Sequence, residues 1–240
     1  MKRRPCWITI VWNLDRYGRY SHRHDIPFEG WIEHGFVRTG PFPTQFIIMS
    51  IAYPHVIEMT CRAADIKRET RETQITVDLN LDGTGKYEVE CDIQFLRHMV
   101  ETLARYAEFD LKMSATGDND HHLIEDVAIT LGKALRQALG DQPIERMATS
   151  TVVMDDAMVM TSLDLVDRPY CEVDCPDPLY VHFFRSFAMT AGITLHILVI
   201  RGFDEHHLIE AGFKSMGKAL KEAIKIRDSE LSNKGSVRIE

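Results

Sequence analysis

An internal duplication constrains this chain more than any other feature of its sequence. The segment His121–Glu125, which reads His-His-Leu-Ile-Glu, recurs as His206–Glu210, 85 positions later. The apolar residues of the helix predicted after each copy repeat at the same spacing. They are Ile124, Ala128, Leu131, Leu135 and Ala138 in the first copy, and Ile209, Phe213, Met216, Leu220 and Ala223 in the second. The chain is therefore predicted to contain two equivalent halves.

The elements before these helices repeat in the same order. Each half has an alternating apolar and polar stretch typical of a half-buried strand, then a helical stripe, then a second alternating stretch. The predicted strands cover 75–82, 109–115, 159–165 and 193–199, and the predicted shorter helices cover 94–107 and 179–191. We predict an α+β fold of two half-domains, residues 59–146 and 147–240, each a small β-sheet backed by two helices and packed about a pseudo-twofold axis.

Residues 1–58 look unlike the rest of the chain. They contain all three tryptophans and five of the nine prolines, and no stretch keeps a helical or strand period for long. One interpretation is an atypical amino-terminal extension that is disordered or docks on the main domain. The other, which we favour, is a mis-assigned start, with translation beginning at Met49 or Met59.

The composition excludes several classes of partner. A formal net charge of −8 and a pI near 5.8 argue against a general nucleic-acid binder, which needs a basic face. No apolar run reaches the roughly 20 residues that span a bilayer, so no membrane association is expected. The five scattered cysteines indicate reduced thiols in a cytoplasmic protein, and Cys171 with Cys175 has no second cysteine pair to complete a zinc site.

Each half supplies the same four candidate metal ligands. A lone histidine precedes each histidine pair, with 22 residues between them in the first half and 23 in the second. The ligands are His98, His121, His122 and Glu125, and then His182, His206, His207 and Glu210. On a helix, positions i and i+4 share a face whereas i+1 is turned away. The first histidine and the glutamate of each copy can therefore approach one ion, and the second histidine is directed elsewhere.

This arrangement predicts two metal sites, each with ligands from both halves. Nitrogen and carboxylate ligands without thiolates suit Mn²⁺, Fe²⁺, Co²⁺ or Zn²⁺. The alternative is two buried histidine pairs at helix starts that are satisfied by hydrogen bonds. His196 is alone on its strand and has no counterpart in the first half, so we assign it a structural role.

Further motifs surround these ligands. They are Arg68–Thr73, Leu79–Gly85, Phe95–Met99, Asp120–Asp126, Arg168–Tyr170, His182–Phe184 and His206–Lys214. Together they resemble the imidazoleglycerol-phosphate dehydratase family of histidine biosynthesis, over about residues 60–235. The resemblance implies that a phosphorylated imidazole substrate, imidazole glycerol phosphate, is dehydrated to imidazole-acetol phosphate. It also implies two Mn²⁺ ions per active site as Lewis acids, and a homo-oligomer of 24 subunits with sites at subunit contacts.

The resemblance assigns roles to individual residues. All eight candidate ligands match metal-binding positions of the family. Glu72 matches a substrate-contacting glutamate and is nominated as the general base for the C–H proton, whereas without the resemblance it reads as a surface carboxylate in a charged run. The residues that match phosphate-binding positions are Arg146, Arg168, Lys214, Ser232 and Lys234, the last two in a carboxyl-terminal substrate-binding tail.

Three positions depart from the family pattern, namely Arg97, Tyr106 and Val181, and their effect on the surroundings of the ligands stays open. Two other functions also stay open. One is a dinuclear metallohydrolase that releases phosphate from an ester. The other is a metal-assembled oligomer without catalytic turnover.

Overall fold

The computed structural model describes residues 62–229 and residue 231. The chain divides into Met1–Thr60 and Cys61–Glu240, and every described residue belongs to the second of these units. The predicted boundary at residue 58 and both interpretations of residues 1–58 lie outside the described residues, as do Ser232 and Lys234.

The first half forms a four-stranded sheet with two helices. Its elements are β1 (Ala63–Glu69), β2 (Thr73–Asn80), β3 (Tyr87–Cys91), α1 (Gln94–Ala107), β4 (Asp110–Gly117) and α2 (Asp120–Leu139). The strand order is β1-β2-β4-β3, antiparallel except for β3 and β4, which α1 connects in parallel. Alternate residues of β2 and β4 are buried, as the alternating apolar pattern predicts.

The second half repeats this topology. Its elements are β5 (Met147–Met154), β6 (Ala157–Asp164), β7 (Tyr170–Val173), α3 (Pro178–Ala191), β8 (Thr194–Arg201) and α4 (Glu205–Ala223), and the strand order is β5-β6-β8-β7. The predicted α+β fold of duplicated half-domains is confirmed. The four predicted strands correspond to β2, β4, β6 and β8, whereas the sequence analysis did not identify β1, β3, β5 and β7.

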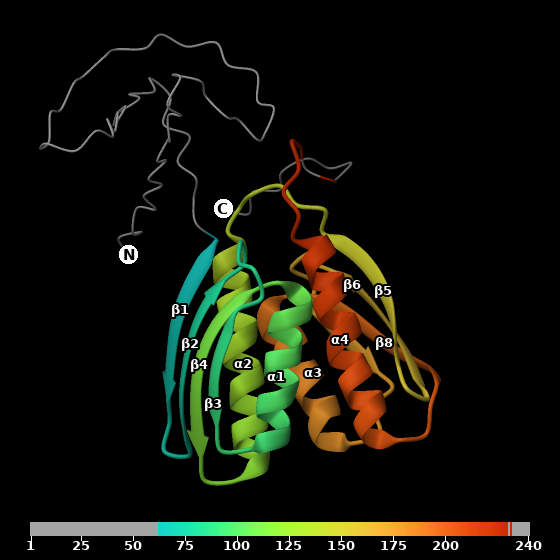
Figure 1. Ribbon diagram of the computed structural model, residues 1–240. Coiled ribbons are helices and arrows are strands. Elements are labelled where there is room, and N and C mark those ends of the chain that lie inside the picture. Colours follow the sequence, from blue (N-terminus) through green and yellow to red (C-terminus); the bar gives the residue numbers. More distant parts are fainter. Residues whose placement is uncertain (1–61, 230, 232–240) are drawn as a thin grey trace, which may run out of the picture. The chain divides into compact units, whose positions relative to one another are not determined.

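The two sheets enclose a layer formed by the helices (Figure 1). On the first sheet, α2 packs against β1, β2 and β4, and α1 packs against β3. On the second, α4 packs against β5, β6 and β8, and α3 packs against β7. Between the halves, α2 contacts α3 and α1 contacts α4. The inner faces share one apolar core, in which Phe183, Phe184 and Phe213 are fully buried.

One extra residue explains why the lone histidine and the histidine pair are separated by 22 residues in the first half and by 23 in the second. Strand pairing places equivalent residues of the two halves 84 positions apart as far as β8. Val159 then faces Val199 but Met158 faces Arg201, which leaves Ile200 as a bulge. Beyond Ile200 the separation is 85, the spacing of the two histidine pairs. The intervals of 22 and 23 residues therefore have their structural cause in β8.

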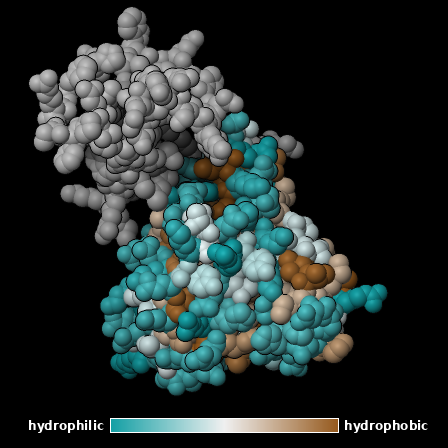
Figure 2. All heavy atoms as spheres, in the orientation of Figure 1, coloured by the Kyte–Doolittle hydropathy of each residue, from teal (hydrophilic) through white to brown (hydrophobic). Residues whose placement is uncertain are grey.

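The outer faces of the two sheets differ in chemistry. At equivalent outward positions the first sheet has Glu69 and Ser114, and the second has Val153 and Leu198, both of them exposed. The bulge residue Ile200 adds a third exposed apolar side chain to the second sheet. Figure 2 shows the described surface in the orientation of Figure 1, where hydrophobic residues form small groups on a largely hydrophilic face. Among the described helices, none is both long enough and apolar enough to cross a membrane.

Equivalent glycines allow the helices of the two halves to approach closely. A Cβ at Gly132 of α2 would lie 2.7 Å from the Phe187 carbonyl oxygen of α3. A Cβ at Gly217 of α4 would lie 3.0 Å from the Leu103 carbonyl oxygen of α1. Gly132 and Gly217 are 85 positions apart, so the duplication has kept the same close contact at both helix pairs.

We expect Gly132→Ala to force α2 away from α3 and to lower the free energy of unfolding by about 1–3 kcal/mol. Gly212→Ala in α4 is the matched control, because its Cβ would meet only ordinary contacts, the nearest being Phe184 at 3.5 Å. Alanine is also up to about 1 kcal/mol better than glycine inside a helix. Chemical denaturation at one protein concentration measures the free energy of unfolding of both variants. Equal values for the two would contradict the close-contact explanation.

Candidate active site

The helix contacts between the halves bring two sets of three candidate ligands together. The α1–α4 set consists of His98, His206 and Glu210, and the α2–α3 set consists of His121, Glu125 and His182. Within each set, one ligand atom from each residue lies within 4.8 Å of the others. Each set therefore combines the i and i+4 ligands of one half with the lone histidine of the other half.

The donor atoms of each set converge on its glutamate. Glu210 Oε2 lies 3.2 Å from His206 Nε2 and 3.4 Å from His98 Nε2. In the other set, Glu125 Oε1 lies 3.3 Å from His182 Nε2, and Glu125 Oε2 lies 3.8 Å from His121 Nε2. Donor atoms that all lie about 2.1 Å from one ion are themselves roughly 3–3.5 Å apart, so this spacing fits a shared divalent cation.

His182 provides an independent test of that fit. Its Nε2 is buried and makes no hydrogen bond, because the contact with Glu125 at 3.3 Å lacks hydrogen-bond geometry. Leaving a buried polar nitrogen without a partner costs about 1–3 kcal/mol. A cation between His182 and Glu125 would remove that cost, so the α2–α3 set fits a bound metal ion.

Glu210 lies in a more enclosed environment than Glu125. It is 6% exposed, and Lys214 Nζ lies 2.8 Å from its Oε1. Burial by itself raises the pKa of Glu210, but the hydrogen bond and charge of Lys214, followed by His98, lower that pKa overall. Glu210 therefore stays ionised, as a carboxylate ligand must be.

The second histidine of each pair turns away from these sets and faces acidic residues. His122 Nδ1 lies 2.8 Å from Asp118 Oδ1, and His207 Nδ1 lies 2.7 Å from Asp156 Oδ1. These hydrogen bonds raise the pKa of both histidines. The hydrogen bond from His207, with the backbone amide of Phe203, lowers the pKa of Asp156 to about 2. The sequence analysis did not identify Asp118 or Asp156.

Glu72 lies in the turn between β1 and β2, beside the first histidine pair. Its Oε2 is 3.8 Å from His122 Nδ1, and its side chain is 55% exposed. A buried network fixes this turn to α2, because Thr73 Oγ1 donates to Asp126 Oδ2 at 2.5 Å and Arg68 pairs with Asp126 Oδ1 at 2.6 Å. The turn therefore keeps Glu72 near the start of α2, with its carboxylate open to solvent.

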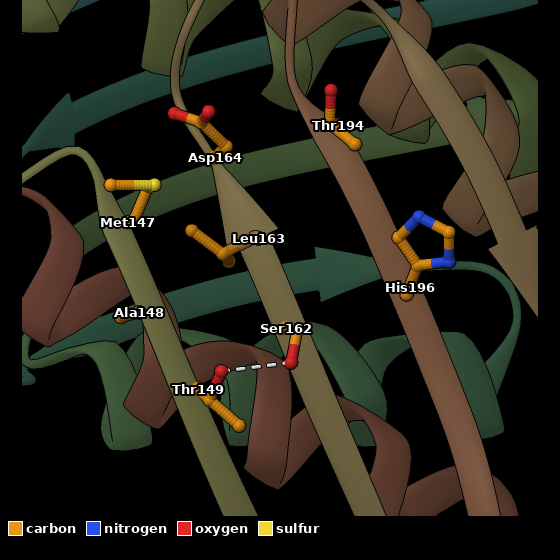
Figure 3. Close-up of a pocket in the computed structure, with 8 residues that line it drawn as sticks. All are labelled: Met147, Ala148, Thr149, Ser162, Leu163, Asp164, Thr194 and His196. Carbon is orange, nitrogen blue, oxygen red and sulfur yellow. Dashed lines mark hydrogen bonds between the residues drawn. The ribbon is translucent and has the colours of Figure 1, made fainter.

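Two of the predicted phosphate ligands lie beside a pocket on the outer face of the second sheet. Figure 3 shows this pocket, which has a volume of about 460 Å³ and is lined by Met147, Ala148, Thr149, Ser162, Leu163, Asp164, Thr194 and His196. Arg146 pairs with Asp164 at 2.8 Å, and the carbonyl oxygen of Arg168 accepts a hydrogen bond from Thr194 at 2.8 Å. Both arginines thus flank the pocket.

This pocket is remote from the two ligand sets of the same chain. β8 begins beside the pocket at Thr194, and its far end leads into α4 and His206. A strand of eight residues spans roughly 25 Å. Lys214, in contrast, lies beside the α1–α4 set. One chain therefore does not bring Arg146 and Arg168 together with its own ligand sets.

The departures from the family pattern leave both ligand sets intact. Arg97 pairs with Glu101 one turn along α1, at 2.8 Å. The ring of Tyr106 lies 5.7 Å from Lys214 Nζ.

Burial raises the pKa of Cys171 and Cys175 to about 11, and in residues 62–229 no cysteine joins a candidate metal cluster.

Comparison with known proteins decides the family. The family model of imidazoleglycerol-phosphate dehydratase matches residues 91–220. The imidazoleglycerol-phosphate dehydratase of Caldanaerobacter subterraneus subsp. tengcongensis is 45% identical over 179 residues, which cover 69% of this chain and 92% of the relative. The chain belongs to the imidazoleglycerol-phosphate dehydratase family. The dehydratase of Lactococcus lactis subsp. cremoris is 44% identical over 199 residues, which cover 74% of this chain and 98% of the relative.

Solved structures of family members share the fold. The Pyrococcus furiosus dehydratase, in complex with (S)-C348, superposes with a TM-score of 0.65 at 35% identity, over 72% of this chain and 100% of that one. The Staphylococcus aureus dehydratase superposes with a TM-score of 0.63 at 28% identity, over 69% of this chain and 99% of that one. The family membership expected from the sequence motifs is confirmed, and the chain is an enzyme of this family.

We expect Glu125→Gln and Glu210→Gln each to remove one bound divalent cation per chain, because each change deletes the only carboxylate of one ligand set. Equilibrium dialysis of the metal-free protein against Mn²⁺, followed by elemental analysis, measures the loss. Glu101→Gln is the control, since Glu101 pairs with Arg97 on α1 and joins neither set. Wild-type stoichiometry in both glutamate variants would rule out these sets as metal sites.

Proposed function

We propose that this chain dehydrates imidazoleglycerol phosphate to imidazole-acetol phosphate in histidine biosynthesis. The observation that best supports this proposal is the pair of three-ligand sets, each built from both halves, in a chain of this dehydratase family. Glu72 lies 3.8 Å from His122, the residue that follows His121 of the α2–α3 set. In this proposal the protein acts on a small phosphorylated substrate in the cytoplasm.

The proposed cofactor is Mn²⁺, with two ions per active site. The ligands would be His98, His121, His122, Glu125, His182, His206, His207 and Glu210. Their nitrogen and carboxylate donors, without thiolates, support an ion of this class. When bound, the ions would supply Lewis acidity at the imidazole nitrogen and at a substrate oxygen.

Glu72 is the proposed general base. Elimination of water requires removal of a proton from carbon and departure of the neighbouring hydroxyl as water. The turn that carries Glu72 is tied to α2 through Thr73 and Asp126, and this contact keeps the Glu72 backbone next to the first histidine pair. Its exposure leaves room for a substrate C–H group to approach the carboxylate, which would accept the proton.

The proposed phosphate ligands are Arg146, Arg168, Lys214, Ser232 and Lys234. Arginine matches the geometry of a phosphate group because its planar guanidinium donates two parallel hydrogen bonds. Since Arg146 and Arg168 lie far from the ligand sets of their own chain, we propose that each active site is completed by other copies of the chain.

A homo-oligomer of 24 subunits is the proposed assembly. Two observations support association between copies. His122 and His207 point away from the ligand sets of their own chain. The outer face of the second sheet exposes apolar residues where its counterpart is polar, and exposed apolar areas mark interaction surfaces.

The direct test is to incubate the Mn²⁺-loaded protein with imidazoleglycerol phosphate. We expect the keto product, with the phosphate still attached. Release of inorganic phosphate would indicate a metallohydrolase instead, and absence of any turnover would indicate a metal-assembled oligomer.

We expect Glu72→Gln to lower kcat by at least about 100-fold, since a positioned general base contributes typically 10²–10⁴-fold. Metal content and assembly are expected to stay unchanged, because Glu72 joins neither ligand set. Glu69→Gln is the matched control on the same hairpin, where Glu69 is exposed and pairs with Lys67 at 3.0 Å. Retained dehydration in the Glu72 variant would remove this residue as the base.

Co-expression of two defective chains tests whether the site is shared between copies. We expect Arg168→Ala to raise KM by at least about 10-fold, because a hydrogen bond to a charged group contributes about 1.5–3 kcal/mol. Oligomers that contain both Glu72→Gln and Arg168→Ala chains should be more active than either variant alone, since some sites would receive both residues intact. Mixed oligomers no more active than their parents would contradict a shared site.

A further inference from the structure

Glu72 and Asp156 occupy the same place in the two halves of the fold. Each is the last residue of the turn before the second strand of its hairpin, β2 or β6. They are 84 positions apart, which is the spacing of the equivalent strand residues. Each also faces Nδ1 of the second histidine of the neighbouring pair, His122 or His207. They are therefore equivalent carboxylates of the duplication.

The carboxylate of Asp156 is fully engaged. Its Oδ1 lies 2.7 Å from His207 Nδ1. Its Oδ2 accepts the backbone N–H of Phe203 at 2.8 Å and that of Asp204 at 3.2 Å. The side chain is 22% exposed. Asp156 thus links the turn, the start of α4 and the ring of His207 in one arrangement.

Glu72 has no comparable hydrogen bonds, because Asp118 takes that role in the first half. Asp118 Oδ1 lies 2.8 Å from His122 Nδ1, whereas Glu72 is 3.8 Å away. The counterpart of Asp118 in the second half, 85 positions later, is Phe203, which is 86% exposed and has no hydrogen-bonding side chain. The residue that holds the second histidine has therefore changed position between the halves.

We propose that Asp118 and Asp156 are positioning residues that hold Nδ1 of His122 and His207, and that this exchange of position leaves Glu72 free to face the substrate. This inference rests on the proposed function. A neutral imidazole carries one hydrogen, and a carboxylate at Nδ1 keeps that hydrogen there. Nε2 then retains its lone pair for a cation.

The Asp156–His207 pair is the clearer of the two cases. At His122, the amide nitrogen of Asn119 also lies 2.7 Å from Nδ1, so two neighbours compete for that atom. At His207, the other carboxylates are farther away, with Asp155 Oδ2 3.4 Å from Nε2. The experiment therefore uses the second half.

Asp156→Asn separates positioning from folding. The asparagine carbonyl can still accept the amides of Phe203 and Asp204, so the turn and the start of α4 keep their hydrogen bonds. Its NH₂ group then faces His207 Nδ1, which has to accept a hydrogen bond. The ring hydrogen moves to Nε2, and the lone pair for the cation is lost.

The measurement is the Mn²⁺ affinity of the metal-free full-length protein, from the electron spin resonance signal of free Mn²⁺. We expect Asp156→Asn to weaken one class of site by about 10–100-fold, with an unchanged thermal unfolding midpoint for the metal-free protein. Adding Phe203→Asp to this variant, which copies the arrangement of the first half, should restore part of the affinity.

Glu205→Gln is the matched control, since Glu205 precedes the same histidine pair in the first turn of α4. Wild-type Mn²⁺ affinity in Asp156→Asn would overturn the inference, as would an equal loss in Glu205→Gln, which would indicate a general effect of charge. A wild-type protein that binds Mn²⁺ without dehydrating the substrate would defeat the proposed function and leave the positioning roles intact.

Discussion

The contact between helices of different halves is the interaction on which the rest of this structure depends. α2 packs on α3 and α1 packs on α4, and each contact is close because a glycine, Gly132 or Gly217, faces the backbone of the other helix. The same contacts bury the apolar faces of all four helices and align the lone histidine of one half with the histidine and glutamate of the other. Core packing and ligand geometry are therefore a single constraint, since the helices cannot separate without separating the donor atoms.

The two halves have the same strand order and helix packing, and they differ in the residues at several equivalent positions. The turn with Glu72 is fixed by the buried Thr73 and Asp126 and by the half-buried Arg68, whereas the equivalent places in the second half are taken by Val152, Ala157 and Ala211. These polar contacts favour one geometry for the turn, because Asp126 bonds Thr73 through one carboxylate oxygen and Arg68 through the other. The second half has instead the exposed apolar residues Val153, Leu198 and Ile200 on the outer face of its sheet, and the two arginines beside its pocket. The two halves thus differ at the turn before their second strand and on the outer faces of their sheets.

Much of the fold followed from periodicity. The long helices and the central strands β2, β4, β6 and β8 each have one face in the core. Their apolar residues therefore recur in the sequence with the period of a helix or a strand. The strands that the sequence did not indicate are at the sheet edges or are short. β1 alternates a few apolar residues with exposed charges, and β7 has only four residues. Their pairing depends on the neighbouring strand, so their own pattern is weak.

The sequence by itself determined the duplication, the candidate ligands and the rule that i and i+4 ligands share one helix face. Those properties are local, since they depend on helical geometry and on residue type. Only the tertiary structure decided that His98 joins His206 and Glu210, that Asp156 holds His207, and that Arg146 and Arg168 lie at the far end of the second sheet. These relations join residues that are distant along the chain, and the packing of helices and sheets, not sequence spacing, sets their distances.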